Sequence, residues 1–362
     1  MFAAGQFLLG TFASNCSSGM SVTKVGERWV NSWDNNLKLA RQLDEAGIDF
    51  MLPIARWIGY GGETNFHGNV LETMTWAAGL LASTNKINVF ATIHTAANHP
   101  VVVAKQMATI DQISRGRIGL NIVAGWNQPE YEALGLNLPA DHESRYAYAE
   151  EWFDVVKRLW EEDQTFDYDG NFFHLKNLLG DPRPEHRAPI LNAAGSGQGR
   201  AFAVRNADFL FTPAIDLGRS TAEIAELKEQ GKAAGRNLGV LTFAHVVCRP
   251  SEKEARDYLQ HFGKDNADWE AVDNLVRLQF AHAQSFPHDL LALIRDRMAA
   301  GHGGFPLVGT PEQVAEGLLA LHRAGFGGTT LSFVDYNAEF PYFRDQVLPL
   351  LEQAGIRKPA QH

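Results

Sequence analysis

The sequence predicts an α/β fold, a (β/α)8 TIM-type barrel with insertions at the C-terminal mouth of the barrel. Short apolar runs, rich in β-branched and aromatic residues, alternate along the chain with longer segments of helical period, which is the pattern of βα units in a parallel sheet. Eight strands are predicted, and eight strands that are each followed by a helix close most naturally into a barrel. A doubly wound open sheet is the alternative architecture.

The predicted strands and helices alternate along almost the whole chain. The strands are expected at residues 6–12, 49–54, 86–93, 117–124, 189–194, 207–214, 240–247 and 328–334. The helices are expected at residues 32–46, 71–83, 100–113, 143–161, 199–205, 220–234 and 311–324, with a last helix near 342–353.

Two of these helices end in the same way. The segments EAGIDF, at residues 45–50, and RAGFGGTTLSF, at residues 323–333, each place a glycine at the end of a helix and a buried strand after it. Glycine is favoured there because it adopts the left-handed conformation that ends many helices. Both segments are therefore expected at the bottom of the barrel, where helices lead back into strands.

The chain has 362 residues, a length that α/β barrels commonly reach as one domain. We expect a single barrel domain over residues 1–362, with insertions near 55–70, 162–187 and 252–309. Long connections in a compact domain are usually functional or act as lids.

Composition excludes several classes of partner. The net charge of -10 argues against sequence-independent binding of nucleic acid, which depends on Lys and Arg. No run approaches the ~20 apolar residues that span a membrane, and the N-terminal segment reads as a strand rather than a signal peptide. Cys16 and Cys248 show neither metal-site spacing nor disulfide density. We therefore expect a cytoplasmic protein.

The clearest local motif is PILNAAGSGQGRAFAV, in which a strand ends, a glycine-rich turn follows and a helix begins. Backbone N–H groups after Gly195 and the hydroxyl of Ser196 would gather at the helix N-terminus, where the helix dipole also favours an anion such as phosphate. In the alternative, Ser196 simply caps the helix. The motif by itself favours the cap.

Two other segments carry polar residues that need partners. Asn121 lies midway along a predicted strand, and burying it unpaired would cost about 1–3 kcal/mol. It either bonds a neighbouring strand or contacts a planar heterocycle or an oxygen species. Arg145 and Tyr146 fall in the first turn of a long helix, where they could bind a phosphate. The alternative for Arg145 is a salt bridge to Glu143 or Glu150.

Metal and hydrolase chemistry find little support in the sequence. The 13 histidines show no HExxH or zinc-site spacing, so no metal is expected. His245 and His282 are the histidines that we expect first to touch a substrate. No GxSxG elbow is present. Three carboxylates keep glycoside hydrolysis as a remote alternative, and they are Glu63, Glu130 and Asp335.

Taken together, these segments resemble the luciferase-like flavin monooxygenases, within the branch that contains alkanesulfonate, dimethylsulfone and pyrimidine ring-opening monooxygenases. The resemblance covers nearly the whole chain, from about residue 7 to about residue 351. Its most specific stretches are DFMLPIARWIGYGGETNF, ATIDQISRGRIGLNIVAGWNQPEYEALG, HESRYAYAEEWFDVVKRLW and NAAGSGQGRAFAVRNAD.

The resemblance implies roles for particular residues. The flavin ring edge would meet Ala55 and Arg56, an arginine where the family has a lysine. The flavin ring or ribityl chain would meet Asn121 and Glu130. The phosphate would meet Gly195, Ser196, Arg145 and Tyr146. The oxygen pocket beside the reduced flavin would consist of Leu52, Thr92, Asn121 and Trp126. Aromatic walls at the mouth would come from Trp57, Tyr60, Phe66 and Trp126.

The resemblance also implies an activity. We expect an FMN-dependent monooxygenase that receives reduced FMN from a separate NAD(P)H:flavin reductase, because no GxGxxG dinucleotide site is present. Oxygen would add at flavin N5 rather than at the 4a carbon, and a small heterocyclic or amide-like compound would be oxygenated or cleaved. Members of the family usually form dimers or tetramers.

Three alternatives to this activity remain. The first is a sulfone or alkanesulfonate monooxygenase, for which Arg56, Arg277, Arg295 and Arg297 are the candidate cations. The second is a deazaflavin-dependent oxidoreductase on the same fold. The third is a non-catalytic flavin-binding protein, in which Thr92 and Asn121 would be ordinary core residues.

Overall fold

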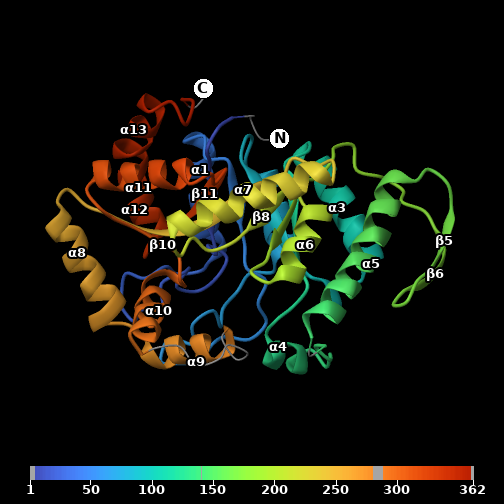
Figure 1. Ribbon diagram of the computed structural model, residues 1–362, viewed down its shortest axis with the longest axis horizontal. Helices are drawn as coiled ribbons and strands as arrows, with labels where there is room; N and C mark the ends of the chain where they lie inside the picture. The colour runs from blue at the N-terminus through green and yellow to red at the C-terminus, as the bar shows by residue number, and fades with distance from the viewer. Residues whose placement is uncertain (1–4, 140, 280–287, 360–362) are drawn as a thin grey trace.

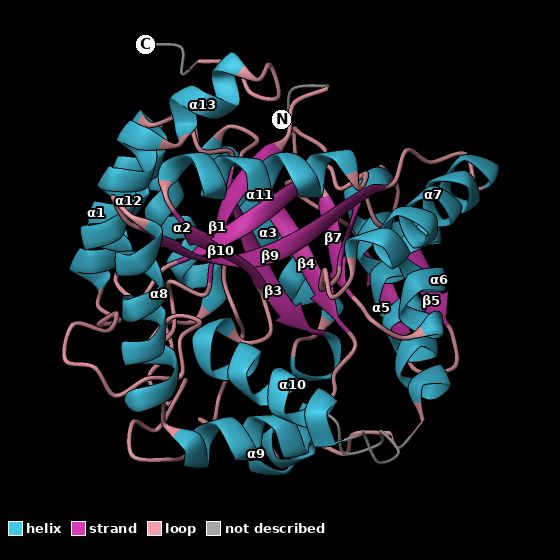
Figure 2. Cartoon of the chain, turned by 60° about the vertical axis from the view of Figure 1, so that its left-hand side comes forward, coloured by secondary structure: helices cyan, strands magenta, loops and turns pink. Residues whose placement is uncertain are grey.

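A computed structural model describes residues 5–139, 141–279 and 288–359, and within them the chain forms a closed barrel of parallel strands surrounded by helices (Figures 1 and 2). The barrel strands are β1 (Leu8–Phe12), β2 (Phe50–Leu52), β3 (Asn88–His94), β4 (Ile118–Val123), β7 (Ile190–Ala193), β8 (Phe209–Phe211), β9 (Gly239–Cys248) and β11 (Gly328–Ser332). Parallel pairing of β9 with both β8 and β11 closes the ring. The predicted barrel is confirmed, and each predicted strand overlaps one of these eight, so the open sheet is wrong.

The barrel interior is filled by aromatic rings that need glycine opposite them. A Cβ atom added to Gly10 on β1 would lie 2.5 Å from the ring of Phe50 on β2. A Cβ atom on Gly119 of β4 would lie equally close, at 2.5 Å, to the ring of Phe90 on β3. At both positions the missing side chain on one strand therefore makes room for the ring from its neighbour.

Most predicted helices are confirmed, with shifts at their ends. They are α1 (Trp33–Glu45), α2 (Thr73–Ala82), α3 (Pro100–Ser114), α5 (His142–Glu161), α6 (Gly197–Asn206), α7 (Leu217–Ala233) and α11 (Pro311–Arg323). The side chains of Ser32 and Thr310 accept hydrogen bonds from N–H groups in the first turns of α1 and α11. Gly47 and Gly325 have φ of 69° and 98°, as expected where a helix ends in the left-handed conformation.

The last predicted helix is two helices. The chain turns at Val347 between α12 (Tyr336–Gln346) and α13 (Leu348–Gln353). Pro349 lies in the first turn of α13, where a missing N–H costs nothing because that group has no partner inside the helix.

The three predicted insertions contain elements that the sequence pattern does not reveal. Residues 162–187 contain an antiparallel hairpin of β5 (Phe166–Asp169) and β6 (His174–Leu178). Residues 252–309 form α8 (Glu252–Gln260), a π turn at His261–Asp265, α9 (Trp269–Gln279), α10 (His288–Gly301) and β10 (Phe305–Gly309), which pairs with β9. Residues 55–70 are irregular apart from a β-bridge between Val70 and Cys16.

A short helix, α4 (Gln128–Ala133), follows β4. The helices α4, α9 and α10 lie beyond the tips of the β3 and β4 arrows, at the end of the barrel where those strands finish (Figures 1 and 2). They therefore stand around the C-terminal mouth. Among the described residues, no helix is both long and apolar enough to cross a membrane.

Candidate active site

Thr92 and Asn121 form a hydrogen-bonded pair on adjacent barrel strands. They stand opposite each other in the β3–β4 register, and the Asn121 Nδ2 donates to the Thr92 hydroxyl at 3.1 Å. The Thr92 hydroxyl in turn donates to the carbonyl of Pro53 at 2.6 Å. The Asn121 Oδ1 atom is buried and has no partner among the described residues. An unsatisfied amide oxygen at this depth costs free energy unless a ligand or a water bonds it.

The other two residues of the predicted oxygen pocket lie on either side of this pair. Leu52 ends β2 and is 1% exposed, within the apolar cluster that fills the barrel. Trp126 follows β4, is half-buried and packs against a cluster that contains Tyr60 and Phe66. The structure thus places apolar walls and the orphaned amide oxygen of Asn121 at the same mouth.

Arg56 and Glu130 form a buried ion pair that joins the loop after β2 to α4. The Arg56 Nη1 lies 2.9 Å from the Glu130 Oε2, and the two side chains are 4% and 0% exposed. The other carboxylate oxygen of Glu130 accepts the backbone N–H of Trp57 at 2.7 Å. The Arg56 guanidinium also lies 5.0 Å from the ring of Tyr60 and 5.2 Å from that of Trp126. Glu130 therefore holds Arg56 in position and balances its charge.

His94, at the end of β3, is neutral. Burial and then the nearby Arg56 charge lower the pKa of His94 to about 3. Its Nδ1 lies 3.9 Å from the Glu130 Oε2, and its ring stands edge-on to Trp57 at 5.5 Å. His245 and His282 were predicted ahead of His94 as substrate contacts, although His94 follows Thr92 by two residues and thus faces the same side of the strand.

The glycine-rich turn forms a helix N-terminus beside Tyr146. Ser196 is the N-cap of α6, and its hydroxyl accepts the N–H of Gly199 at 3.2 Å. A Cβ atom on Gly199 would clash with the Tyr146 hydroxyl, whereas Cβ atoms on Gly195 and Gly197 would meet nothing within 4 Å. Burial raises the pKa of Tyr146, so its hydroxyl stays a donor at neutral pH. Ser196 therefore caps α6, and the turn at Gly195 and Gly197 has open space beside it.

Arg145 is adjacent to Tyr146, but its guanidinium contacts backbone carbonyls of the loop before α5. Its Nε donates to the carbonyl of Pro139 at 2.7 Å and its Nη1 to the carbonyl of Gly125 at 3.2 Å. Gly125 lies two residues past the end of β4, which pairs with β7, so Arg145, Tyr146 and Ser196 all lie at the same rim of the barrel. Arg145 holds the loop between β4 and α5, and the predicted salt bridges to Glu143 and Glu150 do not form in the contacts described.

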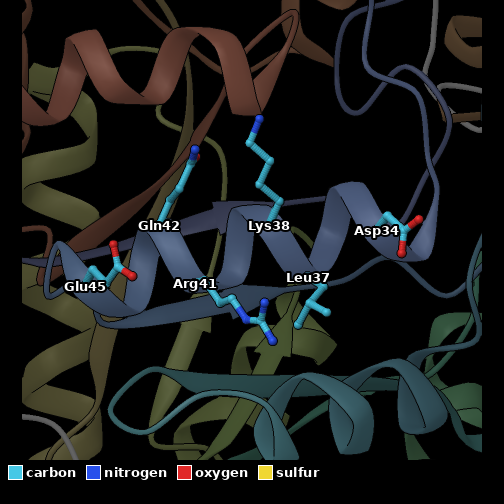
Figure 3. A pocket seen from close by; sticks show the side chains of 6 residues that line it. All are labelled: Asp34, Leu37, Lys38, Arg41, Gln42 and Glu45. Carbon is cyan, nitrogen blue, oxygen red and sulfur yellow. The ribbon is translucent and has the colours of Figure 1, made fainter.

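Two hollows differ in what lines them. One, of about 190 Å³, lies at the mouth and is lined by residues that include Ala55, Arg56, Trp57 and Thr92. A larger one, of about 370 Å³, lies on the outer face of α1, where all six lining residues belong to that helix (Figure 3). Size alone would select the α1 hollow, but its four charged residues, Asp34, Lys38, Arg41 and Glu45, are all exposed. We therefore place the site at the mouth.

Other predicted candidates do not line the mouth hollow or lie outside the described residues. Arg295 is paired with Asp273 on α9 at 2.6 Å, while Arg277 and Arg297 bond Asn274 and the carbonyl of Ile215 at exposed positions. His245 is buried on β9, and burial lowers its pKa to about 4. His282 lies outside the described residues.

The carboxylates proposed for glycoside hydrolysis do not form a pair. Glu63 is 74% exposed and bonded to Lys24, and Asp335 caps α12. Glu130 is bound to Arg56. In the part of the chain that the structure describes, no group of three His, Cys, Asp or Glu side chains could hold a metal ion.

A second cluster, made of Tyr60, Phe66, His67 and His302, was missed as a unit. Its members come from the 55–70 and 252–309 insertions, and the rings of His67 and His302 are stacked at 5.9 Å. Tyr60 and Phe66 were expected as aromatic walls, but nothing in the local sequence indicates that His302, over 200 residues later, stands beside them.

The mouth of the barrel thus combines three features that suit an enzyme. They are the helix N-terminus at Ser196, the buried pair of Thr92 and Asn121, and apolar aromatic walls. The profile of the family described as luciferase-like monooxygenase matches residues 8–328, and the chain belongs to that family. It is therefore a flavin-dependent monooxygenase.

Individual relatives match over nearly their full length. The chain is 30% identical over 345 residues to the FMNH2-dependent dimethylsulfone monooxygenase of Pseudomonas fluorescens strain Pf0-1, covering 94% of this chain and 93% of that protein. It is 32% identical over 350 residues to the pyrimidine monooxygenase RutA of Methylorubrum extorquens strain PA1, covering 95% and 93%. The crystal structure of DmoA from Hyphomicrobium sulfonivorans superposes with a TM-score of 0.87 at 19% identity, covering 99% of this chain and 90% of that one, which shows the shared fold.

Proposed function

We propose that this chain is the oxygenase of a two-component system, which takes reduced FMN from a separate NAD(P)H:flavin reductase and uses O2 to oxygenate or cleave a small, uncharged heterocyclic or amide-like compound. The observation that carries the proposal is the orphaned Oδ1 of Asn121 at the mouth, held in place by Thr92. The names of the relatives support the cofactor, since one is FMNH2-dependent.

The residues at the mouth fit FMN. Its phosphate would be held by the Ser196 hydroxyl, the N–H groups of the turn from Gly195 and the Tyr146 hydroxyl, with Arg145 supporting the loop beside them. Its ring would lie against Ala55 and Arg56, with Asn121 as a polar contact and Glu130 fixing Arg56. Reduced FMN would supply the electrons that activate O2.

The chain's own residues would shape the space for oxygen and substrate. Leu52 and Trp126 would exclude water, and the Thr92 hydroxyl would orient the Asn121 amide through its two hydrogen bonds. The Arg56 charge is balanced by Glu130 and the Arg295 charge by Asp273, whereas Arg277 and Arg297 bond the neutral groups of Asn274 and Ile215. Because Glu130 neutralises the charge of Arg56 at the lining of the mouth hollow, the hollow favours an uncharged substrate over a sulfonate.

Cofactor binding is the first test. We expect FMN to quench the intrinsic protein fluorescence on binding, and Ser196→Ala and Tyr146→Phe to weaken FMN binding about tenfold each while leaving riboflavin binding unchanged, because riboflavin lacks the phosphate. Tight binding of the deazaflavin but not of FMN would overturn the proposal in favour of a deazaflavin-dependent enzyme.

Turnover is the second test. After anaerobic loading with reduced FMN, rapid mixing with O2 should give a transient flavin absorbance in the wild type that Asn121→Ala shortens or abolishes. A non-catalytic flavin protein would instead show the same oxidation trace in both proteins. Light scattering during gel filtration would test the accompanying proposal of a homodimer or homotetramer.

A further inference from the structure

The second cluster, made of Tyr60, Phe66, His67 and His302, lies next to the proposed flavin site. The guanidinium of Arg56 lies 5.0 Å from the ring of Tyr60, and Arg56 also lines the mouth hollow with Thr92. The ring of Tyr60 is 5.8 Å from that of His67 and 6.4 Å from that of His302. The rings of His67 and His302 are stacked, with centroids 5.9 Å apart and an angle of 16° between them. The two histidines and Tyr60 thus form one compact cluster beside Arg56.

The hydrogen bonds of the two histidines define which nitrogen carries the proton. The Nε2 of His67 lies 2.6 Å from the carbonyl of Gly19, and a carbonyl only accepts, so this nitrogen carries hydrogen. The Nε2 of His302 lies 2.7 Å from the Gln279 Nε2, which in this orientation donates, so this nitrogen is bare. For a neutral ring, the Nδ1 of His67 is then an acceptor, and the Nδ1 of His302 is a donor.

Both histidines are neutral at ordinary pH. Burial, followed by the His302 charge, lowers the pKa of His67 well below its usual value. Burial and the Arg56 charge lower the pKa of His302 to about 3. Because both rings are neutral, the Nδ1 of His67 stays an acceptor and the Nδ1 of His302 stays a donor. Protonation would turn both atoms into donors.

The two Nδ1 atoms have no hydrogen-bond partner among the described residues, and neither has the hydroxyl of Tyr60. Three orphaned polar atoms in one small cluster indicate a polar ligand, because a buried polar atom without a partner destabilises the fold. A bare acceptor on one of two stacked rings and a donor on the other are the complement of a group that presents N–H and C=O side by side. That group is a lactam or a cis amide.

We propose that His67 and His302 recognise the H–N–C=O edge of a lactam or amide substrate, with His67 accepting from the N–H and His302 donating to the C=O. This inference rests on the proposed function, because it places the substrate beside the flavin across Arg56. It names the substrate class of that site and two residues that determine specificity, and Tyr60 supplies a third polar contact.

The test measures binding of three small probes to the protein by isothermal titration, with and without oxidised FMN. The probes are 2-piperidone, its N-methyl derivative and dimethyl sulfone, of which only the first has an N–H beside a C=O. We expect 2-piperidone to bind the wild type about tenfold or more tightly than either other probe, because a missing partner leaves a buried group unpaired.

Variants separate the two contacts. His67→Phe keeps a stacked ring but removes the acceptor, so the preference for 2-piperidone over the N-methyl lactam should vanish. His302→Phe removes the donor, so both lactams should weaken about tenfold. His261→Phe, at an exposed position in the same insertion, is the control and should change nothing. Because His67 is 1% exposed, thermal melting checks that its variant is folded, and the half-buried His302 gives an independent result.

The outcomes distinguish the inference from the function. Equal binding of dimethyl sulfone and 2-piperidone to the wild type, or an unchanged preference in a folded His302→Phe, would overturn the lactam assignment even if FMN binds and turnover is normal. Loss of FMN binding with the lactam preference intact would instead contradict the proposed function alone.

Discussion

At the scale of single residues, Thr92 is the link between two strands of the mouth. Its hydroxyl accepts from Asn121 and donates to Pro53, so both hydrogen-bonding directions of one hydroxyl are used. Sequence pattern indicated that Asn121 needs a partner, and only the β3–β4 register shows that the partner is Thr92.

We expect Thr92→Val to lower the free energy of unfolding by about 1–3 kcal/mol, because it leaves the Asn121 amide and the Pro53 carbonyl unpaired in a buried site. Thr92→Ser keeps the hydroxyl and should lose much less. Urea unfolding measures both variants. Equal losses for Val and Ser would show that packing of the methyl group, and not the hydrogen bonds, matters at this position.

The Arg56–Glu130 pair gives a second prediction at this scale. Glu130→Gln should destabilise the protein by about 3–5 kcal/mol, because it leaves a buried guanidinium without its counter-charge. The double variant Arg56→Gln with Glu130→Gln should lose less than the sum of the single changes. Lys253→Gln, which breaks an exposed pair with Asp257, is the surface control and should leave the urea midpoint nearly unchanged. Additive losses in the double variant would contradict the coupling.

At the scale of elements, the strands depend on the fit of glycine against aromatic rings. Gly10→Ala would place a Cβ atom 2.5 Å from the ring of Phe50 inside the closed barrel, so we expect a loss of about 1–3 kcal/mol in unfolding free energy. Gly26→Ala is the matched control, because nothing lies within 4 Å of a Cβ atom there. Chemical denaturation of the two variants measures the difference, and equal stability would show that the ring moves aside freely.

The elements also show where sequence patterns work. All eight barrel strands were predicted because buried parallel strands are short apolar runs, and most helices were predicted because one face of each is apolar. The hairpin β5–β6, the helices α8, α9 and α10 and strand β10 were missed. The hairpin is largely exposed, so its two strands show little apolar patterning, and β10 adds to β9 outside the ring that the eight-strand pattern predicts.

At the scale of the whole molecule, buried histidines make stability depend on pH. The pKa values of His94 and His302 are about 3 and that of His245 is about 4, all below the value of about 6.5 for an exposed histidine. At pH values between the low pKa of each folded histidine and about 6.5, the unfolded chain binds protons that the folded chain does not. Stability contributed by the neutral rings is therefore complete above pH ~6.5 and is lost as pH falls toward 4.

We expect the unfolding free energy to decrease between pH 7 and pH 4, by up to about 1.4 kcal/mol per pH unit for each such histidine. His94→Gln should flatten this dependence, and His174→Gln, on the exposed strand β6, should not. Urea titrations at several pH values measure the slopes. Parallel curves for the wild type and His94→Gln would show that His94 titrates normally in the folded protein.

The sequence by itself determined the barrel, the cap at Ser196 and the resemblance to the flavin monooxygenases, because apolar period, helix caps and contiguous motifs are local properties of the chain. The tertiary structure decided which polar groups meet. It paired Arg56 with Glu130, gave Arg145 backbone partners and brought His67 beside His302 from two distant insertions. Contacts between distant segments depend on closure of the barrel and on which side chains it leaves without partners, and no local pattern records either.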